Sequence, residues 1–83
     1  MADARDDNRP SLSLDCIGLY CPVPVLKTRE EIDKLSLGEV LEVLADDPAA
    51  EADIKAWAKR TGQKLLKVEK GEPGLRFLIQ KVK

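Results

Sequence analysis

The sequence predicts an α/β two-layer sandwich, in which two helices cover one face of a four-stranded mixed sheet in the order βαβαββ. An alternating apolar pattern at 11–16 and a β-prone apolar run at 39–45 each precede a helical pattern, at 22–35 and 48–61. Such strand–helix–strand units pair their strands in parallel through right-handed crossovers. A strong turn signal at 71–74 joins two further strand patterns into an antiparallel hairpin. Two helices with one apolar face each can cover only one side of the sheet.

The folded part of the chain is expected to start near its eleventh residue. The preceding residues are polar and charged and have no hydrophobic period, so we predict a disordered leader at 1–10 and a single small domain at 11–83. In the first strand, Leu12, Leu14 and Cys16 point to one side and polar residues point to the other. This alternation is typical of a half-buried strand, whose apolar side, Cys16 included, faces the core.

The first helix is expected to run from Pro22 to about Leu35. Its stripe of buried positions recurs at helical spacing and comprises Val25, Thr28, Ile32 and Leu35. Gly38 follows at a place where helices often stop. The loop before the helix, 17–20, contains Gly18, which can adopt a positive φ.

The second helix is expected to begin with an aspartate N-cap, Asp46 or Asp47, and Pro48 at its first position. Its apolar stripe comprises Ala50, Ile54, Trp57, Ala58 and Thr61. Gly62 is expected to end the helix. We interpret Trp57 as a core residue rather than a binding platform. The sheet is completed by the two strands of the hairpin, 64–70 and 75–82.

Cys21 is expected at or next to the N-cap of the first helix, followed by two prolines, Pro22 and Pro24. Proline suits the first turn because the N–H that it lacks would have had no partner there. A thiol, in contrast, caps a helix poorly compared with serine or aspartate. The helix dipole favours a thiolate, but the prolines remove two N–H donors and leave those of Val23 and Val25, so we expect only a modestly lowered thiol pKa. A small buried hydrophobe is the alternative interpretation of Cys21.

The chain contains two cysteines and no histidine among its 83 residues. The lack of histidine excludes Cys-His and Ser-His nucleophile pairs, imidazole acid–base catalysis and histidine metal ligands. Cys16 and Cys21 alone cannot fill a zinc site, and their spacing differs from Cys-x-x-Cys, so we predict no metal. No apolar run approaches the roughly 20 residues of a membrane span, and the polar start is unlike a secretory signal. We therefore expect a cytoplasmic protein with no membrane partner.

The formal net charge is −1, but the charges are unevenly distributed. Residues 1–54 carry 5 basic and 13 acidic side chains, whereas residues 55–83 carry 9 basic and 2 acidic ones. Either the two halves neutralise each other in the fold, or the basic half forms a face for an acidic partner or RNA. The sequence pI of about 5.4 argues against many phosphate contacts, so direct nucleic-acid binding is not expected. We expect Lys55, Lys59 and Arg60 to guide docking to acidic proteins.

Several motifs, taken in order, carry a family resemblance. A strand containing Leu14-Asp15 and a Gly18-Leu19 turn lead into Cys21-Pro22-Val23-Pro24 at a helix start. The later matches are Leu35 to Gly38, Asp47-Pro48, Asp53-Ile54, Trp57 and Gly62. In these features, which extend from about residue 12 to the C-terminus, the chain resembles the TusA/SirA-like family of sulfur carrier proteins.

The resemblance implies a βαβαββ sandwich and a persulfide on Cys21, supported by Gly18, Pro22 and Pro24. Such carriers receive sulfur from a cysteine desulfurase or a rhodanese-type enzyme and hand it to an acceptor protein. The family serves tRNA 2-thiolation, molybdenum cofactor synthesis or sulfur oxidation. The resemblance thus implies a sulfurtransferase-type carrier rather than a stand-alone catalyst, with no metal or organic cofactor.

Cys16 departs from many family members, which have no cysteine at this position. It leaves open a thiol–disulfide regulator, in which Cys16 attacks a persulfide on Cys21 and forms a disulfide with it. An RNA-associated module that uses the basic C-terminal half is the other alternative. Fold analogy alone is a weak argument for that second function.

Overall fold

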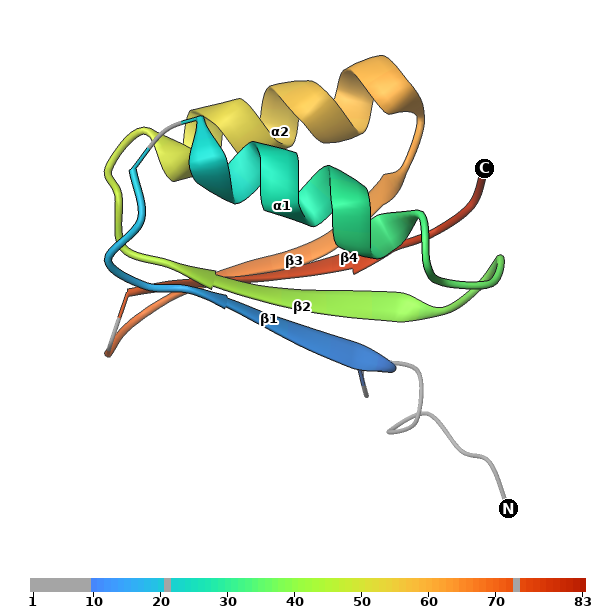
Figure 1. Cartoon of the computed structure of the whole chain (residues 1–83), viewed down its shortest axis with the longest axis horizontal. Coiled ribbons are helices and arrows are strands. Elements are labelled where there is room, and N and C mark those ends of the chain that lie inside the picture. Colours follow the sequence, from blue (N-terminus) through green and yellow to red (C-terminus); the bar gives the residue numbers. More distant parts are fainter. Residues whose placement is uncertain (1–9, 21, 73) are drawn as a thin grey trace.

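The computed structural model describes residues 10–20, 22–72 and 74–83, so the predicted leader lies outside the described residues except for Pro10. The elements, in chain order, are β1 (Leu12–Cys16), α1 (Val23–Ile32), β2 (Val40–Ala45), α2 (Ala50–Thr61), β3 (Lys64–Lys70) and β4 (Leu75–Gln80). The strands form one sheet in the order β1-β2-β4-β3. β1 and β2 are parallel, and β4 is antiparallel to both of its neighbours. Both helices lie on the same face of this sheet, which confirms the predicted α/β sandwich (Figure 1).

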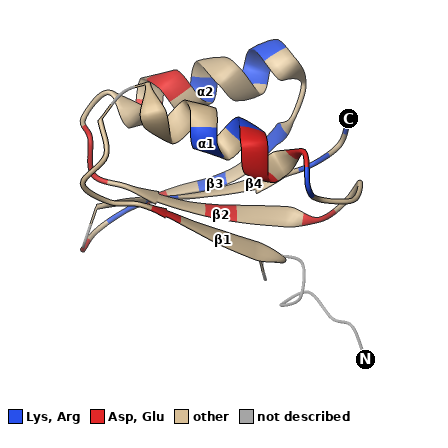
Figure 2. Cartoon of the chain, viewed as in Figure 1, with Lys and Arg blue, Asp and Glu red and all other residues tan. Residues whose placement is uncertain are grey.

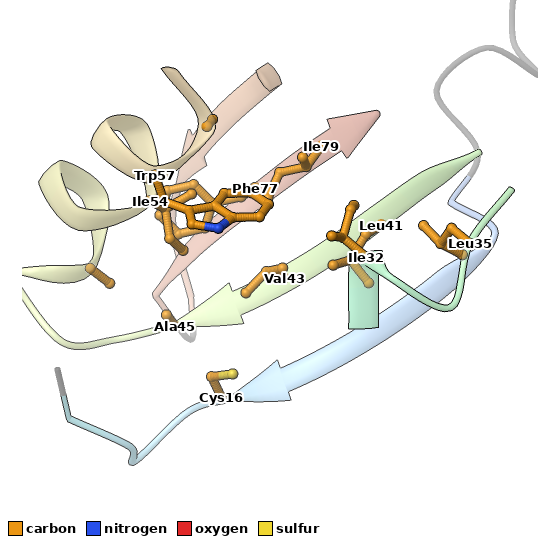
Figure 3. Packing of buried hydrophobic residues seen from close by; sticks show 12 residues of the cluster. Cys16, Ile32, Leu35, Leu41, Val43, Ala45, Ile54, Trp57, Phe77 and Ile79 are labelled. Carbon is orange, nitrogen blue, oxygen red and sulfur yellow. The ribbon is translucent and has the colours of Figure 1, made fainter. Parts of the chain in front are cut away.

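The core lies between the helix layer and the sheet. Figure 3 shows the indole of Trp57 beside Phe77 and Ile54, which confirms Trp57 as a core residue. Phe77 is completely buried and comes from β4, an interior strand. Cys16 is completely buried at the β1 side of the same cluster, as its strand pattern predicts.

Both helices differ from their predicted bounds. α1 ends at Ile32, because the hydrogen bonds that follow close four-residue turns: the N–H groups of Lys34 and Leu35 donate to the carbonyls of Glu31 and Ile32 (both 3.1 Å). Leu35 nevertheless remains in the core, so the apolar spacing continues beyond the helix.

α2 begins two residues later than its start signal predicts. Its N-cap is Ala49, not an aspartate, and this cap has no side-chain hydrogen bond. The Asp47 carboxylate instead accepts the N–H of Ala49 (3.1 Å) and stabilises the turn that precedes the helix. The predicted end is confirmed, since Gly62 closes the helix in the left-handed conformation, with φ 80°.

The face of the sheet opposite the helices carries a polar network across all four strands. The Ser13 hydroxyl donates to Glu42 (2.6 Å), and Arg76 donates to both Glu42 and Glu69, the latter at 2.8 Å. Lys67 forms an ion pair with Glu69 at 3.6 Å. Leu78, the strand-register partner of Glu42 and Lys67, is only 1% exposed. The long polar side chains therefore cover apolar surface on this face of the sheet, which the helices leave open.

Acid should weaken this network. The Ser13 hydroxyl and then the Arg76 guanidinium hold the pKa of Glu42 below its ordinary value of 4.5, and Arg76 also lowers the pKa of Glu69. Because the pKa values of Glu42 and Glu69 are lowered in the folded state, the two carboxylates contribute their full stabilisation above their unfolded-state pKa. This stabilisation is lost as the pH falls through their folded-state pKa. The stability difference between wild type and Arg76→Gln should therefore shrink from pH 7 to about pH 3.

Urea unfolding at a series of pH values measures this difference. Arg60→Gln is the matched control, because Arg60 is exposed on α2 and lies outside the network. A constant difference between wild type and Arg76→Gln across the pH range would contradict the assignment.

Within the described ranges, no helix has the length and apolarity required to cross a bilayer.

Candidate functional site

The candidate site lies at the edge of the sheet where β1 and β2 both end. Cys16 and Ala45 are register partners at the ends of these parallel strands, so the residues that follow them leave the sheet side by side. The contact between them is a hydrogen bond in which the Gly18 N–H donates to Asp46 Oδ1 at 2.9 Å. This bond links the loop before Cys21 to the connection between β2 and α2.

The loop at 17–20 is also ordered by hydrogen bonds to the end of β1. The N–H of Ile17 donates to Asp15 Oδ1 (2.9 Å), and the N–H of Leu19 donates to the Cys16 carbonyl (3.1 Å). Gly18 has φ +85°, and a Cβ placed there would meet nothing within 4 Å. Glycine is therefore favoured at this position by backbone conformation rather than by lack of space, which confirms the expected positive φ.

The start of α1 lies one residue later than predicted. Pro22 is the N-cap, and Pro24 occupies the second helical position, where it is buried. The Val23 N–H donates to the Tyr20 carbonyl at 2.9 Å. The expectation that Val23 offers its N–H to a thiolate is therefore wrong, because that donor already closes the turn from the loop into the helix.

A second hydrogen bond, within the helix, stabilises the first turn of α1. The Thr28 hydroxyl is buried and donates to the Pro24 carbonyl at 2.7 Å. Pro22 and Pro24, both predicted as supporting residues, thus begin a helix whose N-cap makes no side-chain hydrogen bond. The helix start lacks the hydroxyl or carboxylate that usually serves this purpose.

Cys21 itself lies outside the described residues, but its neighbours on both sides are described. Tyr20 is 75% exposed, Pro22 is exposed, and Leu26, one turn further along α1, is 49% exposed. An aromatic side chain and an aliphatic one thus face solvent close to this position in the chain. Exposed apolar side chains of this kind suit contact with another protein.

Cys16 has the environment of a structural thiol. It is free and completely buried, and burial is the main cause that raises its pKa above the ordinary value of 9.0, with Asp15 adding to the rise and Lys27 opposing it. A raised pKa disfavours the thiolate, which is the reactive form. These observations favour a packing role for Cys16.

The three predicted docking residues all lie on α2 and are exposed. Lys55 forms an ion pair with Glu51 at 2.7 Å, whereas Lys59 and Arg60 form no ion pair with any described residue. Figure 2 shows α2 acidic near its start and basic towards its end. Since α2 begins beside the candidate site and runs away from it, Arg60 lies about 15 Å along the helix from Ala50. The fold does not gather Lys59 and Arg60 with the loop at 17–20.

Asp46 is the residue of this site that sequence reasoning assigned wrongly. Its position before Pro48 indicated a helix cap, but its carboxylate accepts from Gly18. The available signal was its place directly after β2, because adjacent parallel strands end at the same edge of the sheet. Among the described residues, no group of three or more cysteine, aspartate and glutamate side chains could hold a metal ion.

Comparisons with known proteins agree with this architecture. The solved structure of a SirA-like protein from Desulfitobacterium hafniense superposes with a TM-score of 0.71 at 20% identity and covers 83% of this chain and 93% of its own. At that identity it shows the fold alone.

Sequence comparisons identify the family. A candidate sulfur carrier protein of Archaeoglobus fulgidus is 52% identical over 71 residues, which are 84% of this chain and 92% of that protein. The sulfur carrier protein TusA of Allochromatium vinosum is 40% identical over 68 residues, which are 82% of this chain and 90% of that protein. The family model described as sulfurtransferase TusA matches residues 12–81. With a match over this span and these relatives, the chain belongs to the TusA family.

Proposed function

We propose that this protein carries sulfane sulfur as a persulfide on Cys21 and relays it from a donor protein to an acceptor protein. The observation that carries this proposal is the hydrogen-bonded loop at 17–20, which leads through position 21 into a helix start without a capping side chain. Membership of a family with named sulfur carriers supports the same chemistry. Residues 11–83 form the proposed carrier domain.

The proposed loading step is an exchange between a thiolate and a persulfide. The Cys21 thiolate attacks the terminal sulfur of a donor persulfide, R–S–SH, and forms a new S–S bond as the donor S–S bond breaks. The donor leaves as the thiolate R–S⁻, and the proton stays on the transferred sulfur. The products are Cys21–S–SH and R–S⁻, so no external oxidant or reductant is required.

The chain itself supplies little acid–base assistance to this step. It has no histidine, and the nearest described helix donor, the Val23 N–H, is already bonded to Tyr20. The α1 dipole remains as a favourable field for an anion at its start. The donor protein therefore provides the activated sulfur, and this protein provides the receiving thiol.

Intact-mass spectrometry tests the proposal directly. After incubation with a cysteine desulfurase and cysteine, the wild-type chain should gain the mass of one sulfur atom, and dithiothreitol should remove it. No mass gain with either a desulfurase or a rhodanese-type donor would overturn the proposed function.

The proposed partners are a desulfurase or rhodanese-type donor and a downstream acceptor protein. The resemblance offers tRNA 2-thiolation, molybdenum cofactor synthesis and sulfur oxidation as pathways. We expect the carrier to contact proteins rather than nucleic acid in any of them. We place it in the cytoplasm, where thiols stay reduced.

Partner docking should depend on the basic end of α2. We expect the charge reversals Lys59→Glu and Arg60→Glu to slow sulfur loading by about 5- to 10-fold at low salt, because electrostatic complementarity mainly raises association rates. The difference should shrink at high ionic strength, since salt screens exposed charges. Intact-mass spectrometry of samples quenched at successive times measures the rate of loading. Lys64→Glu, on the edge strand β3, is the matched control, and equal loading rates for all three variants would contradict docking at α2.

A further inference from the structure

We propose that Asp46 is a positioning residue for sulfur transfer, because its carboxylate holds the loop that presents Cys21. This inference rests on the proposed carrier function and adds to it a residue outside the Cys-Pro-x-Pro motif. Asp46 follows β2 directly, whereas Gly18 lies in the loop after β1. Their hydrogen bond of 2.9 Å joins residues 28 positions apart in the chain.

This hydrogen bond restrains Gly18, the residue of the loop with the greatest intrinsic backbone freedom. Gly18 is the residue that turns the chain with a positive φ, and without a side chain it has more conformational freedom than any other residue type. The acceptor of its N–H is Asp46 Oδ1. A carboxylate acceptor makes a shorter and stronger hydrogen bond with an N–H than a neutral acceptor does.

Asp46 is itself held from the opposite side by the β3–β4 hairpin. A Cβ built on Gly74 would lie 2.6 Å from the Ala45 carbonyl oxygen and 3.0 Å from the Asp46 Cβ, so the hairpin turn packs directly against these two residues. The turn is closed by a bond from the Gly71 N–H to the Gly74 carbonyl (3.0 Å). The carboxylate thus bonds the loop from a backbone that is packed against a third segment.

Positioning matters for this chemistry because the attacking sulfur must approach the donor S–S bond along its axis. A misplacement of about 1 Å at a reacting group can cost about 100-fold in rate. A small reagent can react with the thiol in many orientations, whereas a donor protein holds its persulfide in one position and requires the thiol to be aligned with it. Asp46 should therefore affect loading by a protein donor much more than reaction with a small alkylating reagent.

Three variants test the inference. Asp46→Ala removes the acceptor, Asp46→Asn keeps an oxygen at the same place, and Glu39→Ala is the matched control. Glu39 Oε1 accepts the N–H of Ser36 at 2.7 Å in the loop at the other end of the sheet, so it makes the same type of contact away from the site.

Two readouts separate positioning from stability. We expect Asp46→Ala to lose hydrogen-exchange protection of the Gly18 amide, measured by NMR, and to load sulfur about 10-fold more slowly. Alkylation of Cys21 by iodoacetamide should change by less than about 2-fold. Asp46→Asn should restore most of the loading rate, and Glu39→Ala should load like wild type at a temperature where all variants are folded.

The failures of the two proposals are distinguishable. If Asp46→Ala loads at the wild-type rate, or keeps the Gly18 protection, the positioning role is wrong and the carrier function stands. If Glu39→Ala slows loading as much as Asp46→Ala does, the effect belongs to general stability and the positioning role is again wrong. If the wild-type chain gains no sulfur from any donor, both proposals fail together.

Discussion

Cys21→Ser is expected to abolish sulfur loading, whereas Cys16→Ala should load like wild type. A serine hydroxyl cannot form the S–S bond that the exchange requires, so no residual activity is expected at this position. Cys16 is completely buried, and burial raises its thiol pKa, so it lacks both the access and the ionisation that attack on a donor requires. The two substitutions thus remove one thiol each, with opposite expected results.

Mass spectrometry of the intact protein after incubation with desulfurase and cysteine measures both variants in the same run. Circular dichroism at the same temperature establishes that each variant is folded. An equal mass gain in wild type and Cys21→Ser would show that sulfur is carried elsewhere. A larger or longer-lived mass gain in Cys16→Ala than in wild type, with the fold intact, would instead support the thiol–disulfide alternative, in which Cys16 attacks the persulfide on Cys21.

Phe77→Ala is expected to destabilise the fold by about 3–5 kcal/mol. Phe77 is completely buried in β4, and its register partners are Val43 on β2 and Val68 on β3. Truncation removes an aromatic ring from the middle of the sheet and leaves a cavity that the flanking strands cannot fill. For a small domain with a total stability of about 5–15 kcal/mol, this loss is a large fraction of the whole.

Urea unfolding followed by circular dichroism measures the loss as a lower transition midpoint. Leu37→Ala is the control, because this leucine is 68% exposed in the loop before β2 and its truncation should change stability by less than about 0.5 kcal/mol. Similar midpoints for Phe77→Ala and Leu37→Ala would contradict the position of Phe77 at the centre of the core.

The order of elements could be predicted because each one carries its own local signal. The alternation of Leu12, Leu14 and Cys16 identified a strand with one buried side, and the structure buries Cys16 completely. Gly62 ended α2 as predicted, since only a residue tolerant of positive φ is favoured there. These signals depend on neighbours a few positions away, which a single sequence displays.

The candidate site was less predictable because its contacts join distant segments. Asp46 and Asp47 both read as caps of α2, but one carboxylate bonds Gly18 and the other bonds the turn at Ala49. Which role each aspartate takes depends on the parallel pairing of β1 with β2, and no local pattern encodes it. The Val23 N–H was misassigned for a different reason, because a local acceptor, the Tyr20 carbonyl three positions earlier, takes this donor.

The bond between Gly18 and Asp46 also sets a limit on how small a working fragment of this protein can be. A synthetic peptide of residues 11–32 would contain the loop, both prolines and the whole of α1, yet it would lack the acceptor from the β2–α2 connection and the hairpin packed behind it. In such a peptide the Gly18 amide would bond water. The loop conformation described here therefore belongs to the folded chain as a whole, and minimal mimics need a replacement constraint, such as cyclisation, to reproduce it.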